Sequence, residues 1–301
     1  MIIEELIKQR ILILDGASGT MIQKYKLSEE EYRGNKFISH TINLKGCNDI
    51  LNISKPEIIK QITLAYLNAG ADIVCTNTFN AQSVSLSDYG LEQYAYEINL
   101  ASAKLVKETV KSFVKQNSGR DCFVAGSIGP TNRTASISSD VNNPAFRAVT
   151  FDELVIAYTQ QVEGLMDGEV DLLIVETVFD TLNVKAALYA ITEVFENKRK
   201  KIPVIVSVTI SDASGRTLSG QTLEAFLISV SHFPLFSVGL NCALGAAQMK
   251  PFVAFLAEKA PFNISLYPNA GLPNQLGGYD EKPEEMVAIM EQYMNNGLVN
   301  M

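Results

Sequence analysis

Residues 171–178 read DLLIVETV, an apolar and β-branched run that ends in an acidic residue and a threonine. Apolar residues follow one another almost without interruption, as in strands whose sheet is covered on both faces. Runs of the same kind recur along the chain and alternate with segments of helical spacing. The predicted strands are 10–14, 71–79, 122–128, 171–178, 202–210, 236–241 and 263–267. This pattern favours a parallel sheet.

The segments between these strands carry helix signals with recognisable ends. Ser54, followed by Pro56 and Glu57, predicts the start of a helix that ends at Gly70. Thr150 and Glu153 have the spacing of a capping box ahead of another helix. Further helices are predicted over 92–114, 181–196, 223–231, 246–258 and 283–295. The basic run 198–201 follows a helix and is expected to be solvated there, complementing the helix dipole.

Seven strand–helix units without a Pro-, Gly- or Ser-rich linker predict an α/β fold, a (β/α)8 TIM barrel, as one domain over 1–301. Residues 298–301 are apolar and follow a helix stop, so they are expected to begin an eighth strand that is incomplete. Such a barrel would have unpaired edges beside its first and seventh strands and a tendency to associate. The long stretches 25–53 and 132–149 are expected to be loops that line the active site.

Composition excludes several classes of protein. The chain has 301 residues, 47% of them hydrophobic, which is enough for a full core. Its net charge of -8 argues against binding to nucleic acid. Apolar runs shorter than about ten residues cannot span a membrane, and the N-terminus lacks the pattern of a signal peptide, so a cytoplasmic location is expected.

The thiols and imidazoles are scattered through the sequence. Four cysteines occur without a C-x-x-C pair, and the two histidines lie apart from them and from each other. A disulfide framework is therefore not expected. Any metal would need ligands that are distant in sequence.

Polar residues follow the predicted strands where a parallel barrel brings its carboxyl ends together. Asp15 and Glu176 are carboxylates at two such ends, where they could bind a substrate ammonium or act as acid and base. The alternative for both is loop capping. The glycines beside Asp15 would allow a ligand to approach the backbone, and Glu176 directly follows an apolar run, where a structural role would require a buried partner.

Cys242 lies at another strand end, beside Asn241. A cysteine is more often a small buried hydrophobe than a nucleophile or ligand, so residue type alone does not settle its role. Cys75 and Cys122 lie in or beside apolar runs and are expected to be core residues, whereas Cys47 belongs to a loop and is unassigned. The segment 126–130, GSIGP, lacks the spacing of a phosphate-binding loop and predicts a tight turn.

Eight segments in order give the sequence a family resemblance. They are LDGASGTMIQ, GCNDILNISKPEII, AGADIVCTNTFNA, VAGSIGPTNRTAS, DLLIVETVFDTLNVKAAL, VSVTISDASGRTLSGQT, VGLNCALGA and YPNAGLPNQLGGYDEKPEEM. Together they resemble the N-terminal homocysteine-binding domain, the homocysteine S-methyltransferase domain, of cobalamin-dependent methionine synthase. The likeness covers essentially the whole chain.

The resemblance implies a (β/α)8 barrel that binds zinc through three cysteines and delivers homocysteine as a zinc thiolate to methylcobalamin, giving methionine. Coordination to zinc would supply the thiolate, the nucleophilic form of a group that is mostly protonated at neutral pH. By position, Cys242 matches the first zinc ligand and is the expected catalytic residue. Asp15 and Glu176 match residues that hold the amino-acid part of homocysteine. The surrounding pocket is matched by Gly16, Asn77, Thr78 and Asn241.

The resemblance also contains a departure. The family's other two zinc ligands are adjacent cysteines after the eighth strand, and no such pair occurs among these 301 residues. The expectation is a homocysteine domain that holds zinc weakly or not at all and is impaired alone. Cobalamin and methylfolate would belong to other domains or chains.

Three alternatives stay open at this point. One is a homocysteine methyltransferase that uses S-methylmethionine or betaine, although 138–154 and 268–284 look more like the cobalamin-dependent form. A second is a binding protein that keeps the amino-acid pocket without turnover. A third is a different barrel, such as an aldolase or a pterin-binding enzyme; the absence of a lysine at a predicted strand end lowers the case for an aldolase.

Overall fold

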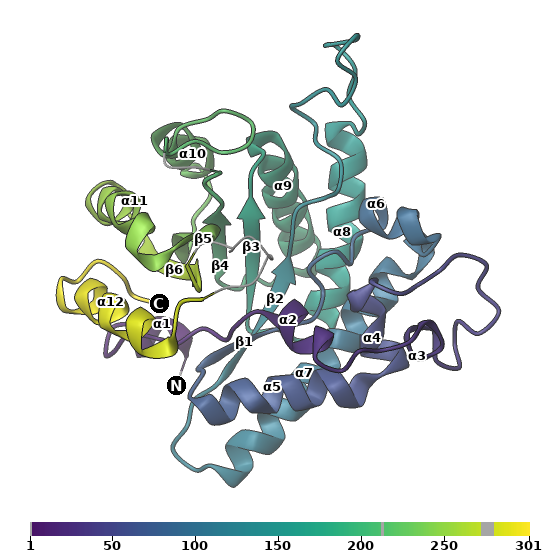
Figure 1. Cartoon of the computed structure of the whole chain (residues 1–301), viewed down its shortest axis with the longest axis horizontal. Helices are drawn as coiled ribbons and strands as arrows, with labels where there is room; N and C mark the ends of the chain where they lie inside the picture. The colour runs from purple at the N-terminus through teal and green to yellow at the C-terminus, as the bar shows by residue number, and fades with distance from the viewer. Residues whose placement is uncertain (1, 212–213, 272–279) are drawn as a thin grey trace.

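A single parallel sheet forms the centre of the molecule. The computed structural model describes residues 2–211, 214–271 and 280–301, and its described part contains a sheet with strand order β1-β2-β3-β4-β5-β6 (Figure 1). The strands are β1 (Ile73–Cys75), β2 (Phe123–Ile128), β3 (Leu172–Val178), β4 (Val204–Val208), β5 (Ser237–Gly245) and β6 (Asn263–Asn269). Every neighbouring pair is parallel, as the continuous apolar runs predicted.

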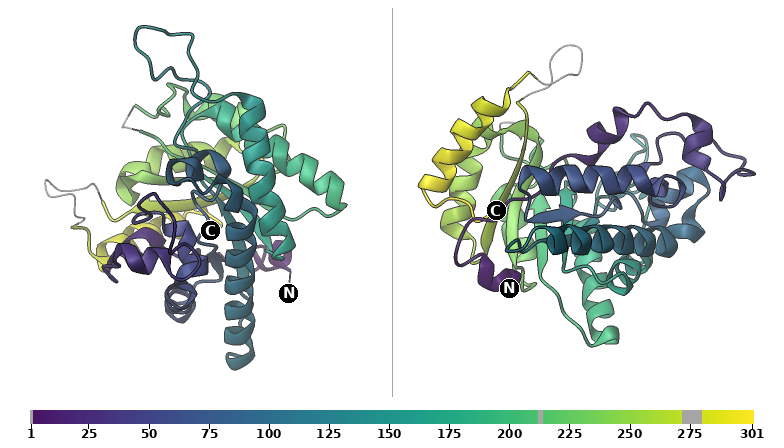
Figure 2. Two further views of the ribbon diagram at one scale, coloured as in Figure 1. Left: turned by 90° about the vertical axis from the view of Figure 1, so that its right-hand side faces the viewer. Right: turned by 90° about the horizontal axis from the view of Figure 1, so that it is seen from below.

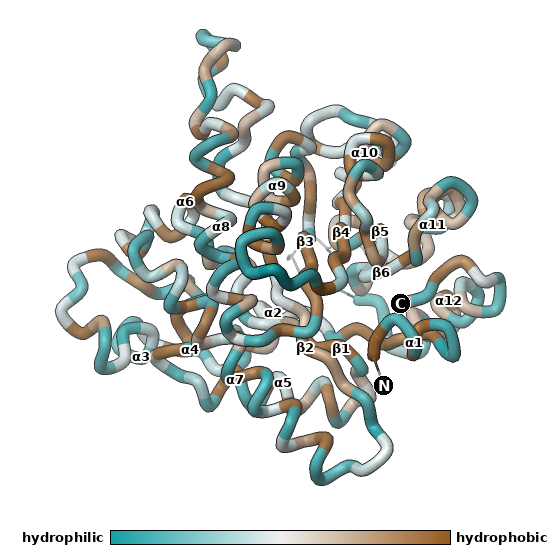
Figure 3. Tube along the Cα trace, turned by 180° about the vertical axis from the view of Figure 1, so that it is seen from behind, coloured by the Kyte–Doolittle hydropathy of each residue, from teal (hydrophilic) through white to brown (hydrophobic). Residues whose placement is uncertain are grey.

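Helices alternate with these strands and lie on the outside of the curled sheet (Figures 1 and 2). They are α1 (Ile3–Leu6), α2 (Ser18–Gln23), α3 (Glu29–Arg33), α4 (Leu51–Ser54), α5 (Pro56–Ala69), α6 (Ser83–Leu86), α7 (Ala95–Gln116), α8 (Phe151–Asp167), α9 (Thr181–Lys198), α10 (Leu223–Val230), α11 (Ala246–Lys259) and α12 (Pro283–Asn295), with 3₁₀ turns η1 (Asn48–Ile50), η2 (Ser87–Tyr89) and η3 (Glu92–Tyr94). Figure 3 shows hydrophobic residues concentrated on the strands and on one side of the surrounding helices. All six residues of β2 are buried, as are all five of β4. This two-sided burial drives the sheet to the centre.

Two of the predicted eight strands are not formed as regular strands. The segment 10–14 contributes only a parallel bridge from Leu14 to Ile73, because it pairs with β1 over too few residues. The segment 298–301 lies on the far side of β6, where Asn300 N donates to Ile264 O at 2.8 Å. The observed architecture is thus a six-stranded, curled part of a barrel flanked by two short segments.

Hydrogen bonds join these two segments to each other. Leu12 N donates to Asn300 O at 3.0 Å, and Leu266 N donates to Met301 O at 3.1 Å. The edges beside β1 and β6 are therefore not left wholly unpaired, contrary to the expectation of open edges. The C-terminal residue and the segment that follows α1 both lie at this closure (Figure 1).

Some predicted ends of helices and strands are confirmed, and others differ in the structure. Thr150 accepts from Glu153 N, and the Glu153 carboxylate accepts from Thr150 N, so the capping box is formed. Ser54 was predicted to cap the next helix, but it ends α4, where its hydroxyl donates to Ile50 O at 3.2 Å. The predicted strand 71–79 shortens to β1 because the chain turns away from the sheet after Cys75.

Two further observations concern the helices and the outer loops of the molecule. The described helices include none long and apolar enough to cross a membrane. The predicted loop 132–149 forms the arm above α8 in Figure 1, where Val141 is 93% exposed; contrary to the expectation, none of its residues is among the described residues that line the candidate active-site cavity. Parts of two segments that carried the family resemblance, at 212–213 and 272–279, lie outside the described residues.

Candidate active site

A cavity of about 300 Å³ opens at the carboxyl ends of the strands. Its walls come from most strands of the sheet and from the long loop after the first segment. The lining residues are Asp15, Gly16, Ala17, Ser18, Gly19, Asn48, Asp49, Cys75, Thr76, Asn77, Thr78, Phe79, Asn80, Ser127, Glu176, Thr177, Asn241, Cys242 and Tyr267. All seven predicted site residues are in this set, so the structure brings them together.

Asp15 is held at the start of the cavity by two donors. Its Oδ2 accepts from Cys75 N at 2.6 Å, and its Oδ1 accepts from the Tyr267 hydroxyl at 2.9 Å. Removal from water raises the pKa of Asp15 to about 6, while these two hydrogen bonds oppose the rise. The carboxylate is therefore fixed in position, and it takes up a proton as the pH falls through about 6.

Glu176 projects from the end of β3 into the same space. Its Oε1 accepts from the Ser127 hydroxyl of β2 at 2.5 Å. Desolvation raises the pKa of Glu176 from its ordinary value of 4.5 to about 7, and the nearby charge of Asp15 adds to the rise. A carboxyl group with a pKa near 7 can give or take a proton at physiological pH.

Asn241 organises the ends of β3 and β5. Its Oδ1 accepts from Thr177 N at 3.0 Å and from the Ser207 hydroxyl at 2.6 Å, and its Nδ2 donates to Thr177 Oγ1 at 2.8 Å. The same amide nitrogen donates to Cys242 Sγ at 3.1 Å. This buried side chain therefore locks two strand ends and orients the thiol, a more specific role than the surrounding-pocket position implied by the resemblance.

The backbone at these strand ends is unusual. Thr177, Cys242 and Ala243 all have positive φ, at 57°, 58° and 59°. Such angles are uncommon outside glycine and cost conformational energy unless the surroundings hold them. The strand registers shift at the same places, between Val175 and Val178 and between Asn241 and Gly245. The irregular ends direct Glu176 and Cys242 toward one cavity.

The thiol of Cys242 is partly buried and lies in a negative environment. Desolvation raises its pKa, and the charge of Glu176 adds to the rise, while the hydrogen bond from Asn241 opposes it. Cys242 is therefore a protonated thiol near neutral pH in the absence of a bound cation.

The other predicted site residues have structural partners as well. Thr78 is fully buried, and its hydroxyl donates to Ser127 O at 2.7 Å, so it supports the cavity wall. Asn77 Nδ2 donates to Asn48 O at 2.7 Å, tying the strand end to the loop. Gly16 packs beneath Tyr66, whose ring would lie 2.6 Å from an added Cβ. A side chain at position 16 would therefore clash with Tyr66, which explains the glycine independently of any ligand that approaches the backbone.

Sequence reasoning missed three contributors to the site. Cys75 was expected in the core, but it is partly accessible and lines the cavity, where burial together with Asp15 and Glu176 raises its pKa well above the ordinary value. Tyr267 and Ser127 hold the two carboxylates through their hydroxyl groups. Ser127 and Tyr267 lie near the ends of predicted strands, and this position could have marked them as candidates. It was not sufficient, because the sequence does not tell which side chains of an apolar run point into the barrel.

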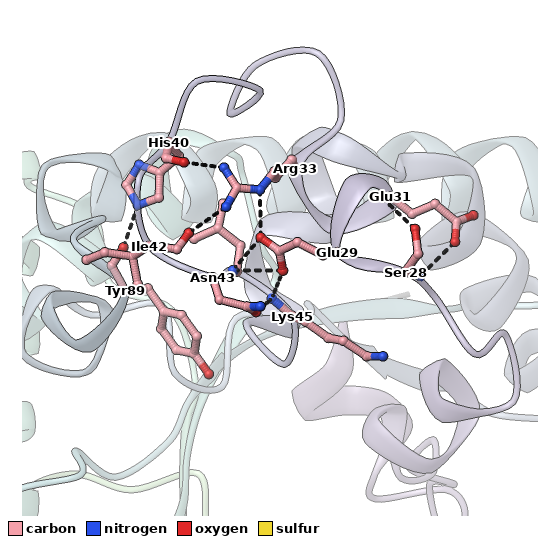
Figure 4. A network of polar contacts seen from close by, with 10 residues as sticks. Ser28, Glu29, Glu31, Arg33, His40, Ile42, Asn43, Lys45 and Tyr89 are labelled. Atoms are coloured by element: carbon pink, nitrogen blue, oxygen red, sulfur yellow. Dashed lines mark hydrogen bonds and ion pairs between the residues drawn. The ribbon is translucent and has the colours of Figure 1, made fainter.

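The loop 25–53 forms one wall of the site, as predicted, and a polar network fixes it (Figure 4). Glu29 accepts from the backbone nitrogens of Leu44 and Lys45 and from Arg33 Nε at 2.7 Å. Arg33 also donates to the carbonyl of Ile42 at 3.0 Å. The segment 25–53 is consequently fixed in place by these hydrogen bonds.

A metal site is not assembled by the described residues. They include no group of three or more His, Cys, Asp or Glu side chains placed to hold an ion. Cys242 could supply one sulfur, whereas a tetrahedral thiolate site with an open position needs three protein ligands. The residues described here therefore do not fit a resident zinc ion.

The architecture and this acid-and-thiol cavity define a parallel α/β protein with an enzyme-type site at the carboxyl ends of its strands. The family model for homocysteine S-methyltransferase matches residues 12–301, and the chain belongs to that family.

Solved structures of the homocysteine methyltransferase MmuM from Escherichia coli have the same fold. The oxidized form has a TM-score of 0.74 at 19% identity and covers 97% of this chain and 90% of that one. The metallated form has a TM-score of 0.72 at 20% identity, covering 95% of this chain and 98% of that one.

Proposed function

We propose that this chain binds L-homocysteine in the 300 Å³ cavity and presents its sulfur for methylation, with methionine as product. The observation that carries the proposal is the convergence of Asp15, Glu176 and Cys242 on one cavity in a chain of this family. Carboxylates without a basic neighbour in the lining suit the ammonium of an amino acid. The residues 1–301 would act together as the homocysteine-binding barrel domain.

The chain's own groups supply binding and proton transfer. Asp15 is fixed by Cys75 N and Tyr267, which gives it a set position for contact with the amino-acid part. Glu176 has one oxygen bonded to Ser127 and a pKa near 7, so it can accept the thiol proton of homocysteine. The sulfur lone pair then forms the new carbon–sulfur bond while the bond from methyl to donor breaks, and that electron pair leaves with the donor.

The proposed donor is methylcobalamin carried by another domain or chain, as the methionine synthase resemblance implies, with methylfolate handled elsewhere. Cys242 would offer one sulfur to a zinc ion. Because the described residues do not complete such a site, no catalytic step is assigned to the metal here.

Methyl transfer and ligand binding test this function separately. Purified chain is titrated with L-homocysteine by calorimetry and then assayed for methionine with methylcobalamin, S-methylmethionine or betaine in parallel. Homocysteine binding that weakens in Asp15→Asn, Glu176→Gln and Cys242→Ser, but not in the exposed-site control Asp152→Asn, supports the site. Absence of homocysteine binding by the folded wild type would overturn the proposal.

A further inference from the structure

A second, smaller cavity adjoins the site. This side chamber has a volume of about 180 Å³ and is lined by Gly46, Cys47, Asp49, Asn80, Ser85, Leu86, Asp88, Tyr89 and Asn132. Asp49 and Asn80 line both this chamber and the larger cavity. The carboxylate of Asp49 therefore stands between the two spaces.

Asp49 is a buried carboxylate with incomplete hydrogen bonding. Its residue is only 4% exposed, and Oδ1 accepts from Asn80 N at 2.9 Å. No other residue in the part of the chain that the structure describes donates a hydrogen bond to Oδ2. Since Asp49 lines both cavities, this oxygen is the one left to contact a bound molecule.

No cation of the protein balances this charge. Among the described residues, none of the ion pairs involves Asp49, and neither cavity has a Lys, Arg or His in its lining. Asp88, at the chamber's exposed side, is different because Arg133 lies 3.5 Å from its Oδ1. A buried charge without a partner is costly, which favours binding of a cation.

Three carboxyl groups line the larger cavity, and their oxygens are not equally occupied. Asp15, Glu176 and Asp49 all line the larger cavity, and both oxygens of Asp15 already accept hydrogen bonds. Glu176 and Asp49 each keep an oxygen without a donor from another described residue. Because Glu176 is assigned to proton transfer, Asp49 is the carboxyl group left for a cationic head group.

The chamber wall is built to keep its shape. Tyr89 O is bonded to His40 Nε2 at 2.7 Å, and His40 belongs to the same network as Arg33 and Glu29 (Figure 4). Asn132 donates to the Asp88 carboxylate on the opposite side. The chamber is therefore a preformed space of a size suited to a short alkyl group with a charged head.

We propose that Asp49 binds the head group of a small organic cation, an alkylammonium or a sulfonium, that occupies the side chamber. The identity of the cation rests on the proposed function, and two sources share this chemistry: the ammonium of homocysteine and the cationic end of a small methyl donor. In either case Asp49 is a substrate-binding residue that the family resemblance did not assign.

The first test uses a probe that requires no methyl transfer. Propylammonium chloride is titrated into wild type, Asp49→Asn and Asp152→Asn while ligand line broadening is followed by NMR. Asparagine can still accept from Asn80 N, so a purely structural role is preserved while the charge is removed. Loss of one buried charged contact should weaken binding about 10- to 100-fold in Asp49→Asn and leave Asp152→Asn unchanged.

The second test distinguishes the source of the cation. If Asp49 holds the ammonium of homocysteine, its neutralisation weakens homocysteine binding but not binding of 4-mercaptobutyrate, which lacks the ammonium. If it holds the donor, homocysteine binding is kept and the KM for S-methylmethionine rises. Equal propylammonium binding by wild type and Asp49→Asn, or none by the folded wild type, would overturn the proposal whether or not methyl transfer is found.

Discussion

A large apolar groove lies near the amino ends of β4 and β5, whereas the candidate active site lies at the carboxyl ends of the strands. The groove has a volume of about 940 Å³ and runs beside α9 and the segments that enter β4 and β5. Its walls include Leu188, Tyr189, Phe195, Ile202, Phe233 and Phe236. The active-site cavity is about 300 Å³ and lies at the carboxyl ends.

The difference between these two regions is chemical. Two desolvated carboxyl groups with pKa values of about 6 and 7, a thiol and two residues with positive φ, Thr177 and Cys242, converge on the smaller cavity. The groove offers mainly hydrophobic surface. Perturbed acids and strained strand ends mark functional sites more specifically than volume does. Substitutions in the two regions should therefore have very different effects.

The largest effect is expected from Glu176→Gln. The amide can still accept from Ser127, but it cannot take the proton of a thiol, so methyl transfer to homocysteine should fall about 100- to 1000-fold. Initial rates of methionine formation measure the change. The matched substitution in the groove, Glu196→Gln, should leave the rate within about twofold of wild type; equal losses in both variants would remove the distinction between the regions.

The second effect is structural and concerns Asn241. Replacement by alanine removes its bonds to Thr177, Ser207 and Cys242, leaving buried groups unpaired. The free energy of unfolding should fall by about 2–3 kcal/mol, and homocysteine binding should weaken as the strand ends relax. Urea unfolding of Asn241→Ala measures the loss, with exposed Asn296→Ala as control. An unchanged unfolding midpoint would show that this network does not hold the site.

A third prediction concerns stability and pH. The folded-state pKa of Glu176 is raised to about 7 from 4.5, so ionisation destabilises the folded form. Its contribution to the free energy of unfolding is therefore most favourable below pH 4.5 and is lost as the pH rises through 7. Glu176→Gln should be more stable than wild type by about 1–3 kcal/mol at pH 8, after allowance for partial exposure, and the difference should vanish near pH 4.5.

Chemical denaturation of both proteins from pH 4.5 to 8 checks the sign of this prediction. The amide avoids the cost of a desolvated charge and retains a hydrogen-bond acceptor for Ser127. A constant difference across the range would contradict the raised pKa. A wild type favoured at pH 8 would indicate that a cation within the site already stabilises the carboxylate.

The smallest effect is expected in the groove. Tyr189 is 51% exposed on α9, and its ring contacts Phe151 edge-on with centroids 6.1 Å apart. Tyr189→Ser should change homocysteine affinity by less than about twofold, since it lies away from the carboxyl-end cavity. Calorimetry measures this affinity. A tenfold loss would mean that the apolar groove takes part in binding the substrate.

Much of the fold and the core of the site could be predicted from the sequence. The apolar runs that became β2 to β6 are long and buried on both faces, so their hydrophobicity identifies them without knowledge of their partners. Asp15 and Glu176 are candidates from their places at the ends of predicted strands, whereas the role of Cys242 is implied only by the family resemblance. Parallel pairing then brings them together.

The rest depends on tertiary contacts that periodicity does not encode. Residues 10–14 and 298–301 pair over a few hydrogen bonds only, so neither forms a regular strand. Cys75 and Tyr267 sit in apolar runs, where the sequence does not tell an inward side chain from an outward one. Asp49 lies in a long segment between predicted strands. Its burial depends on Asn80 and other residues that are distant in sequence, so the sequence pattern does not indicate it.

The central claim is that homocysteine occupies the cavity between Asp15, Glu176 and Cys242. A crystal structure of the chain soaked with L-homocysteine tests it most directly. We predict density in this cavity, with the ligand sulfur facing Cys242 and the ammonium against a cavity carboxylate. An empty cavity at a saturating concentration, or density confined to the apolar groove beside α9, would contradict the account.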